Sequence, residues 1–263
     1  MRVPYKTLLA VGCFSFAASP LLVAQTATTA STDEKKDEAK EEQVVISEDS
    51  IVGKMATTVG QYFSAKSPKE RLSFILDPEK NEPLMRDFYF REAYIPGGLS
   101  AITVPQAVAV GGLAFWKTNF TLKDGRQGTV FLRLVDNQPK VDWPSQVNYS
   151  PVKWDDWLKE KADKPVDFRV MAQIDNYYPK AYSDRTKYIC VKVSNMESPS
   201  TVFAYLNIAD PDQLEFAQML ANSQGQPKDC VLTLKLDKNA DEIQTATVEK
   251  VVSPSWLIIG GGK

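Results

Sequence analysis

The chain has 263 residues, with 31 basic and 33 acidic side chains, and it contains no histidine. This charge balance provides no basic run for a phosphate backbone, so we expect no nucleic-acid partner. The absence of histidine excludes serine–histidine triads, histidine acid–base catalysis and nearly every zinc or copper site, so we expect no metal and no cofactor.

Residues 1–24 have the pattern of a secretory signal peptide. Arg2 and Lys6 precede an uncharged apolar stretch from Leu8 to Val23, and Ala24-Gln25 forms a cleavage site. An uncleaved anchor is the alternative, because a stretch of this length can just cross a bilayer. We favour cleavage and predict export to the periplasm, the cell surface or the medium. No later segment is apolar enough to span a membrane, so we expect the exported part not to be membrane-spanning.

Residues 25–46 are predicted to be a disordered tether. Small polar residues come first, and a charged run from Asp33 to Glu42 follows without any aromatic or branched apolar residue. A segment of this composition cannot bury enough surface to offset the entropy of ordering. An interaction tail is the alternative interpretation.

Residues 47–148 are predicted to form a first domain, which opens with three helices. Apolar residues recur at helical spacing at Ile51, Met55, Val59 and Tyr62. Ser67-Pro68-Lys69-Glu70 is a capping box that opens a second helix, and Asp77-Pro78 ends or redirects the chain. A third, short helix is expected over residues 83–90.

An antiparallel meander is predicted to follow these helices. The segments rich in β-forming residues are 107–110, 113–122, 129–135 and 140–143. Lys123-Asp124-Gly125-Arg126 is a suitable hairpin turn between the second and the third of them. The fold class that follows is α+β, with the helices preceding the sheet.

The segments S-P-K-E-R-L from Ser67 and P-L-M-R-D-F-Y from Pro83, with the meander that ends in Val141-Asp142-Trp143, resemble the NTF2-like (cystatin-like) group. More narrowly, the chain is similar to uncharacterised exported proteins of the Verrucomicrobia and Planctomycetes type. The resemblance covers roughly residues 51–147. It implies a curved antiparallel sheet wrapped around helices, a conical pocket and a possible homodimer through the open sheet face. The group includes isomerases, dehydratases and non-catalytic domains, so the fold does not supply a function.

Residues 149–263 are predicted to form a second, smaller α+β domain. A short helix carries Trp154 and Trp157, and another helix starts at Asp210-Pro211. The expected strands are 166–174, 189–193, 202–208, 231–236 and 244–252. Cys190 and Cys230 either form a disulfide, as an oxidising compartment allows, or stay buried and free.

Four aromatic residues are weak candidates for ligand binding, namely Trp116, Trp143, Tyr177 and Tyr178. The two tyrosines belong to Asp175-Asn176-Tyr177-Tyr178, with Tyr182 and Asp184 nearby. Rings and oxygen-bearing side chains in this mixture can hold a carbohydrate or a peptide. A strand end that packs its own tyrosines explains the same pattern and is the simpler interpretation.

Asp142 is the one weak candidate for catalysis. A carboxylate buried beside Trp143 would have a raised pKa and could act as a general base. Alternation along a strand favours instead an Asp142 that points to solvent. We therefore predict an exported non-catalytic binding or adaptor protein for a small apolar ligand or a partner protein. The alternative is a carboxylate-dependent lyase or isomerase that works in the conical pocket, so whether the chain is an enzyme stays open.

Overall fold

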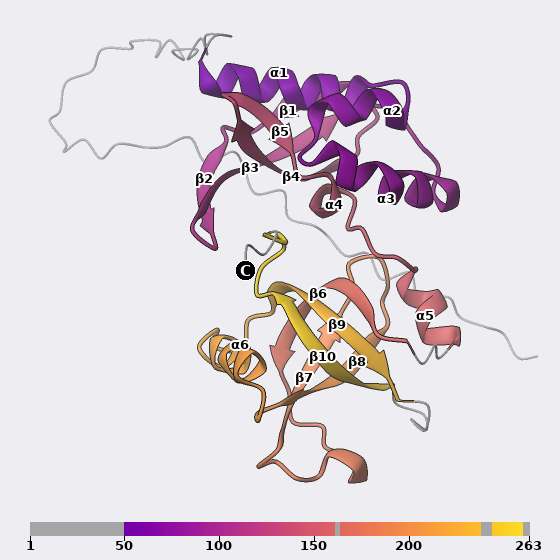
Figure 1. Cartoon of the computed structure of the whole chain (residues 1–263), viewed down its shortest axis with the longest axis vertical. Helices are drawn as coiled ribbons and strands as arrows, with labels where there is room; N and C mark the ends of the chain where they lie inside the picture. Colours follow the sequence, from indigo (N-terminus) through magenta and orange to yellow (C-terminus); the bar gives the residue numbers. More distant parts are fainter. Residues whose placement is uncertain (1–49, 161–163, 238–243, 260–263) are drawn as a thin grey trace, which may run out of the picture. The chain divides into compact units, whose positions relative to one another are not determined.

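The first helix, α1 (Ile51–Ser64), contains the four apolar residues whose spacing predicts it. In this computed structural model the Ser50 hydroxyl caps it by accepting the Gly53 N–H at 3.0 Å. Met55, Val59 and Tyr62, spaced at three and four residues, are fully buried. They pack against the sheet that follows, which α1 crosses in Figure 1.

The next two helices differ in length from the prediction. The Ser67 hydroxyl accepts the Glu70 N–H at 3.2 Å and opens α2 (Pro68–Arg71), but this helix lasts one turn and tightens into η1 (Leu72–Phe74). The third helix, α3, runs over Pro78–Arg91 and therefore begins earlier than predicted. Asp77 turns the chain with a left-handed φ of 45°, and Pro78 takes the first helical turn, where its missing N–H costs nothing. Pro83 lies inside the helix rather than at its start.

Five antiparallel strands form a curled sheet beside these helices. They are β1 (Leu99–Ile102), β2 (Gln106–Val110), β3 (Leu113–Leu122), β4 (Gln127–Val135) and β5 (Gln138–Val141). The long strand β3 pairs with β2 through its first half and with β1 through its second half, and β4 and β5 follow on its other side. The predicted α+β arrangement of helices with an antiparallel sheet is confirmed, and β1 is an added strand. We call residues 50–147, including the short helix α4 (Trp143–Gln146), the sheet lobe.

The second half of the chain closes five strands into a barrel. The strands are β6 (Val166–Ile174), β7 (Tyr188–Ser194), β8 (Thr201–Asn207), β9 (Lys228–Leu236) and β10 (Thr245–Ser253). Around the barrel they follow the order β10-β8-β7-β6-β9, and β9 closes it on β10. β8 and β10 run parallel, and every other pair is antiparallel. We call this unit the barrel.

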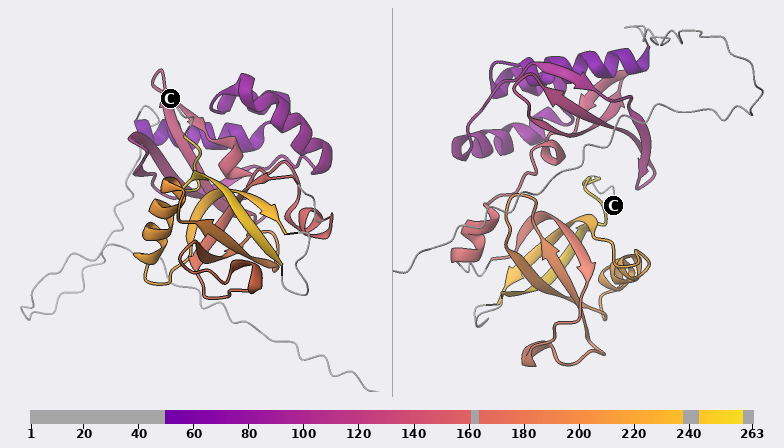
Figure 2. Two further views of the ribbon diagram at one scale, coloured as in Figure 1. Left: turned by 60° about the horizontal axis from the view of Figure 1, so that its bottom comes forward. Right: turned by 180° about the vertical axis from the view of Figure 1, so that it is seen from behind.

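Three helical segments accompany the barrel strands in the described part of the sequence. α5 (Trp154–Glu160) precedes β6, the short turn η2 (Lys180–Tyr182) lies between β6 and β7, and α6 (Pro211–Ala221) connects β8 to β9. α6 packs its buried face against the core of the barrel, as the views in Figure 2 show. The strand order of this closed barrel, with a helix between its third and fourth strands, is that of OB-type barrels.

The core of the barrel follows from alternation along its strands. On β6 the residues Phe168, Val170 and Ala172 point inward and are fully buried. Trp154 and Trp157 of α5 pack their rings on Phe168 at centroid distances of 5.0 and 4.8 Å. These tryptophans are core residues, as the sequence suggests.

Contacts between distant residues join the sheet lobe to the barrel. Arg169 of β6 donates from Nε to the Trp256 carbonyl at 3.2 Å and from Nη1 to the Tyr149 carbonyl at 2.9 Å. The Trp256 indole donates to the Ser145 carbonyl at 3.0 Å, and Leu257 is buried in one cluster with Phe115. The segment after β10 thus returns to the sheet lobe.

The structure describes residues 50–160, 164–237 and 244–259, all within one compact unit. The predicted signal peptide (1–24) and tether (25–46) lie outside these residues. Within the three described ranges, no helix combines the length and the apolar composition that a membrane span requires.

Candidate functional site

Trp143 belongs to the core of the sheet lobe, and Trp116 packs against this core. Trp143 has no exposed surface, and its ring lies 5.7 Å from that of Phe88 and 5.4 Å from that of Tyr149. Trp116 is half-buried against the same cluster. Packing within the protein accounts for the Trp143 ring, whereas part of Trp116 stays exposed.

Asp142 is not a strand residue, because β5 ends at Val141. Its carboxylate Oδ1 accepts the Ser145 N–H at 3.0 Å and caps α4 (Trp143–Gln146). The predicted strand over 140–143 fails here because Pro144 takes the first turn of a helix. Asp142 also lines a cleft of about 200 Å³ together with Arg169.

The concave side of the sheet is filled by side chains of the protein. The buried residues that meet there are each at most 6 % exposed: Met55, Val59, Tyr62, Phe63, Ile75, Met85, Phe120, Leu122, Val130, Leu132, Val141 and Trp143. Interiors packed in this way leave few voids larger than a water molecule. These side chains form the main core of the sheet lobe.

The predicted tyrosine cluster forms on the outer face of β7 and β8. The loop 175–187 brings Tyr177, Tyr178 and Tyr182 onto Cys190, Phe203 and Tyr205 of these strands. On β8 the residues Val202, Ala204 and Leu206 alternate with the outward Phe203 and Tyr205 and fill the inside of the barrel. We call this group, with Tyr188, the aromatic face. The sequence predicts the loop tyrosines of the aromatic face. Its strand residues could be predicted only by knowing which side of β8 faces outward.

The loop is fixed to the barrel by stacking and by hydrogen bonds. The Tyr182 ring stacks on that of Tyr205 at 3.6 Å with an interplanar angle of 5°. The Tyr182 hydroxyl donates to Asp237 Oδ2 at 2.7 Å, and Thr245 donates to the same oxygen at 2.8 Å. The Tyr205 hydroxyl donates to the Tyr177 carbonyl at 2.9 Å. The aromatic face is therefore ordered before any ligand arrives, which reduces the entropic cost of binding.

Cys190 and Cys230 are both buried and free. Cys230 belongs to the cluster inside the barrel, whereas Cys190 belongs to the aromatic face outside it. Because the two side chains lie on opposite sides of the barrel wall, the disulfide alternative does not form and the free-thiol alternative holds. Burial raises the pKa of the Cys190 thiol to about 11, so this thiol is unreactive at neutral pH.

The free energy of unfolding is expected to fall at alkaline pH because of the buried groups of the aromatic face. Burial, the largest cause, raises the pKa of Tyr182 and Tyr205 above 10.0, and that of Cys190 from 9.0 to about 11. Each group contributes stability that is complete below its unfolded pKa and is lost as the pH rises through its folded pKa. Urea unfolding between about pH 7 and 11 should thus show a declining free energy of unfolding above about pH 9. Tyr182→Phe should make the decline shallower, and equal slopes in both proteins would contradict the assignment.

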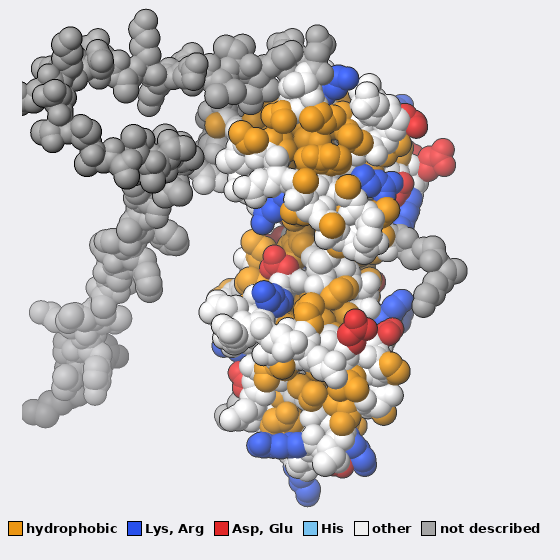
Figure 3. Space-filling view, turned by 90° about the vertical axis from the view of Figure 1, so that its left-hand side faces the viewer, with side chains coloured by type: hydrophobic (Ala, Val, Ile, Leu, Met, Phe, Trp, Pro, Cys, Tyr) orange, Lys and Arg blue, Asp and Glu red, His pale blue; other side chains and the backbone are white. Residues whose placement is uncertain are grey.

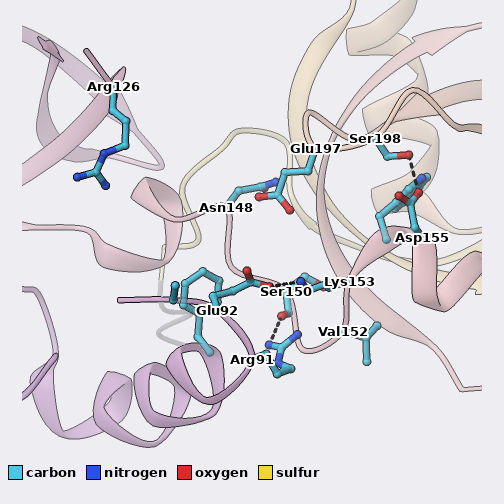
Figure 4. A pocket seen from close by; sticks show the side chains of 13 residues that line it. Arg91, Glu92, Arg126, Asn148, Ser150, Val152, Lys153, Asp155, Glu197 and Ser198 are labelled. Carbon is cyan, nitrogen blue, oxygen red and sulfur yellow. Dashed lines mark hydrogen bonds and ion pairs between the residues drawn. The ribbon is translucent and has the colours of Figure 1, made fainter. Parts of the chain in front are cut away.

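A second candidate site is a cleft of about 740 Å³ shown in Figure 4. Its wall combines the end of α3, the segment 148–155 and the loop between β7 and β8. A neighbouring cleft of about 530 Å³ lies beside β4 and β6. Asn148 and Glu197 line both, so we call the pair of clefts the Asn148 cleft. Its size suits a small molecule, and junctions between structural units commonly hold such sites.

The described residues contain no group of three or more acidic or cysteine side chains placed to hold a metal ion. Comparison of the chain with protein-family models, with curated proteins and with solved structures finds no match. The argument for a function therefore rests on the two sites.

Proposed function

We propose that the chain is an exported, non-catalytic binding protein that holds an oligosaccharide on the aromatic face of its barrel. The aromatic face is the observation that carries this proposal. In OB-type barrels the outer side of the second and third strands, with the loops beside it, is where ligands bind. β7 and β8 are those strands here, and the loop 175–187 is the first of those loops.

The chemistry of the aromatic face suits a sugar. Tyr177, Tyr178 and Tyr188 are half-buried, and the Arg185 guanidinium lies 4.5 Å from the centroid of the Tyr178 ring. A pyranose could stack its apolar face on the exposed parts of Tyr177 and Tyr188, and it would have to displace Arg185 to stack on Tyr178. The exposed Asn176 and the half-buried Asp175 supply oxygens beside the rings that can accept hydroxyl hydrogens. Single-stranded nucleic acid would need a basic groove along such rings. The chain has 31 basic and 33 acidic side chains, and both kinds are present on the one face of the protein shown in Figure 3.

The sheet lobe is proposed to be an NTF2-like platform without a catalytic role. The helices α1 and α3 and the curled antiparallel sheet support this assignment, which remains a proposal. For the rival function, a carboxylate-dependent lyase or isomerase, the candidate base Asp142 caps α4 with its carboxylate, and we therefore favour the non-catalytic function.

Binding to an array of soluble oligosaccharides tests the proposal. We expect Tyr177→Leu combined with Tyr178→Leu to weaken binding at least tenfold, equivalent to about 1.4 kcal/mol, because leucine keeps bulk but offers no ring. The matched control is Phe90→Leu, which alters an aromatic side chain that is 91 % exposed on α3. Thermal unfolding of each variant verifies that the barrel is intact. Equal binding by the double variant, or binding of peptides or single-stranded DNA in place of sugars, would overturn the proposal.

A further inference from the structure

Arg185 adds a cation without a counter-ion to the aromatic face. The residue is exposed, and its guanidinium carbon lies 4.5 Å from the centroid of the Tyr178 ring. Within the part of the chain that the structure describes, this guanidinium makes no hydrogen bond and no ion pair. Arginine presents its N–H donors in a planar fork. The whole fork is therefore available to a ligand that reaches the aromatic face.

The ring under Arg185 is held in place by the barrel. The hydroxyl oxygen of Tyr178 accepts the Cys190 N–H of β7 at 3.1 Å. The turn that bears Arg185 is ordered as well, because the Thr186 N–H donates to Asp184 Oδ1 at 3.0 Å. A guanidinium held over an aromatic ring keeps its N–H groups for a second partner. The support is thus fixed, while the donors stay unused.

Basic side chains outnumber acidic ones around this ring. The loop 175–187 and β7 carry Lys180, Arg185, Lys187 and Lys192 against Asp175 and Asp184. Asp184 is already paired, since its Oδ2 lies 3.4 Å from Lys187 Nζ. The carboxylate of Asp237 lies on the far side of this loop, where it accepts from Tyr182 at 2.7 Å. The part of the aromatic face around Tyr178 therefore has a surplus of positive charge.

A second cation accompanies the exposed Tyr177 ring. This ring packs on that of Phe203 at 4.7 Å. Lys192 of β7 is the register partner of Phe203, and both alternate with residues that fill the barrel. Lys192 thus lies on the same outer side. A ligand that stacks on Tyr177 meets basic side chains on both of the neighbouring rings.

We infer that the aromatic face is selective for acidic oligosaccharides, in which a uronate carboxylate binds the Arg185 guanidinium while a sugar ring stacks on Tyr177. This inference rests on the proposed function, since it names the class of sugar for that same site. Tyr178 then serves as the support of Arg185 rather than as a stacking surface. A carboxylate matches the fork of arginine, and charge-assisted bonds of this kind are stronger than those between neutral groups. A single-stranded nucleic acid would instead need a series of open rings along a basic groove.

Oligosaccharides of galacturonic acid and of guluronic acid test the inference. Each is compared with its methyl ester, which keeps the sugar rings and removes the charge. At neutral pH and low salt, titration calorimetry should show about five- to tenfold tighter binding of the acid than of the ester for at least one of the two sugars. Arg185→Met should abolish this preference, because methionine can cover the Tyr178 ring but carries no charge.

Lys187→Met is the matched control, because it removes a positive charge from the same loop, from an ammonium group that Asp184 already pairs. It should retain the preference for the acid, and Arg185→Lys should retain only part of it, since an ammonium group lacks the fork. Thermal unfolding verifies that each variant is folded.

Three results would overturn the inference and leave the proposed sugar site standing. They are equal affinity for acids and esters, binding of neutral sugars only, and an equal loss of preference in Lys187→Met and Arg185→Met. Absence of binding to every acidic, esterified and neutral sugar would overturn the proposed function as well. Tighter binding of a dT oligonucleotide than of any oligosaccharide would also overturn both.

Discussion

Trp143→Ala is expected to lower the free energy of unfolding by about 3–5 kcal/mol, the cost typical of removing a buried tryptophan. Trp143 is fully buried, and rings of Phe88, Tyr89 and Tyr149 lie around it at 5.7, 6.3 and 5.4 Å. Its indole N–H points to the Tyr89 hydroxyl at 3.4 Å. Because these partners come from α3 and from the segment after α4, a cavity here loosens several elements at once.

Urea unfolding followed by far-ultraviolet circular dichroism measures this loss. Trp116→Ala is the matched control, because Trp116 packs on the same cluster but is only half-buried. We expect its loss to be clearly smaller than that of Trp143→Ala. A ligand-binding role without a packing role for Trp143 would give the opposite result, a loss of less than about 1 kcal/mol.

Local signals predict most of the helices and strands. The capping box that begins at Ser67 and the alternation along β6 act over a few residues, so the sequence displays them directly. The prediction is wrong where two local signals compete. At Pro78 the same proline that can end a helix begins one, and the sequence does not show which side of it the helix occupies.

The closure of the barrel lies beyond such signals. The parallel pairing of β8 with β10 joins strands that are separated by α6 and β9, and no spacing in the sequence specifies it. The aromatic face depends on this closure, because Tyr182 reaches Asp237 only when the end of β9 lies beside the loop 175–187. Tyr177 and Tyr178 could thus be predicted from composition, and Tyr205 and Asp237 could not.

The Asn148 cleft illustrates the same limit. Asn148 stands in a segment that the sequence marks as a boundary between domains, where asparagine is an ordinary turn residue. Glu197, which lines the same cleft, belongs to a loop of the barrel and lies near Asn148 only because the two halves pack together. Such a cleft is a property of three-dimensional packing, so a sequence does not reveal it.

Arg169→Met is expected to destabilise the protein by about 0–3 kcal/mol and to loosen the segment after β10. Two effects oppose each other. The two hydrogen bonds to the Tyr149 and Trp256 carbonyls contribute about 1.5–3 kcal/mol each because the donor is charged. Burial lowers the pKa of Arg169 to about 10, and the neighbouring Asp142 and Asp167 offset only part of this cost, so the variant regains about 3 kcal/mol.

The hydrogen bonds of Arg169 therefore outweigh the cost of its burial by a small margin. We expect the variant to change local hydrogen exchange more than it changes the global free energy of unfolding. Hydrogen exchange of the amides after Ser253 should accelerate in Arg169→Met, because the Trp256 carbonyl loses the donor that holds it to β6. Arg126→Met is the matched control: its ion pair with Asp124 is exposed and contributes about 0–1 kcal/mol. Slower exchange together with higher stability in Arg169→Met would mean that desolvation outweighs the hydrogen bonds. Arg169 would then be retained for some role other than stability, with the 200 Å³ cleft that it lines as the place to look.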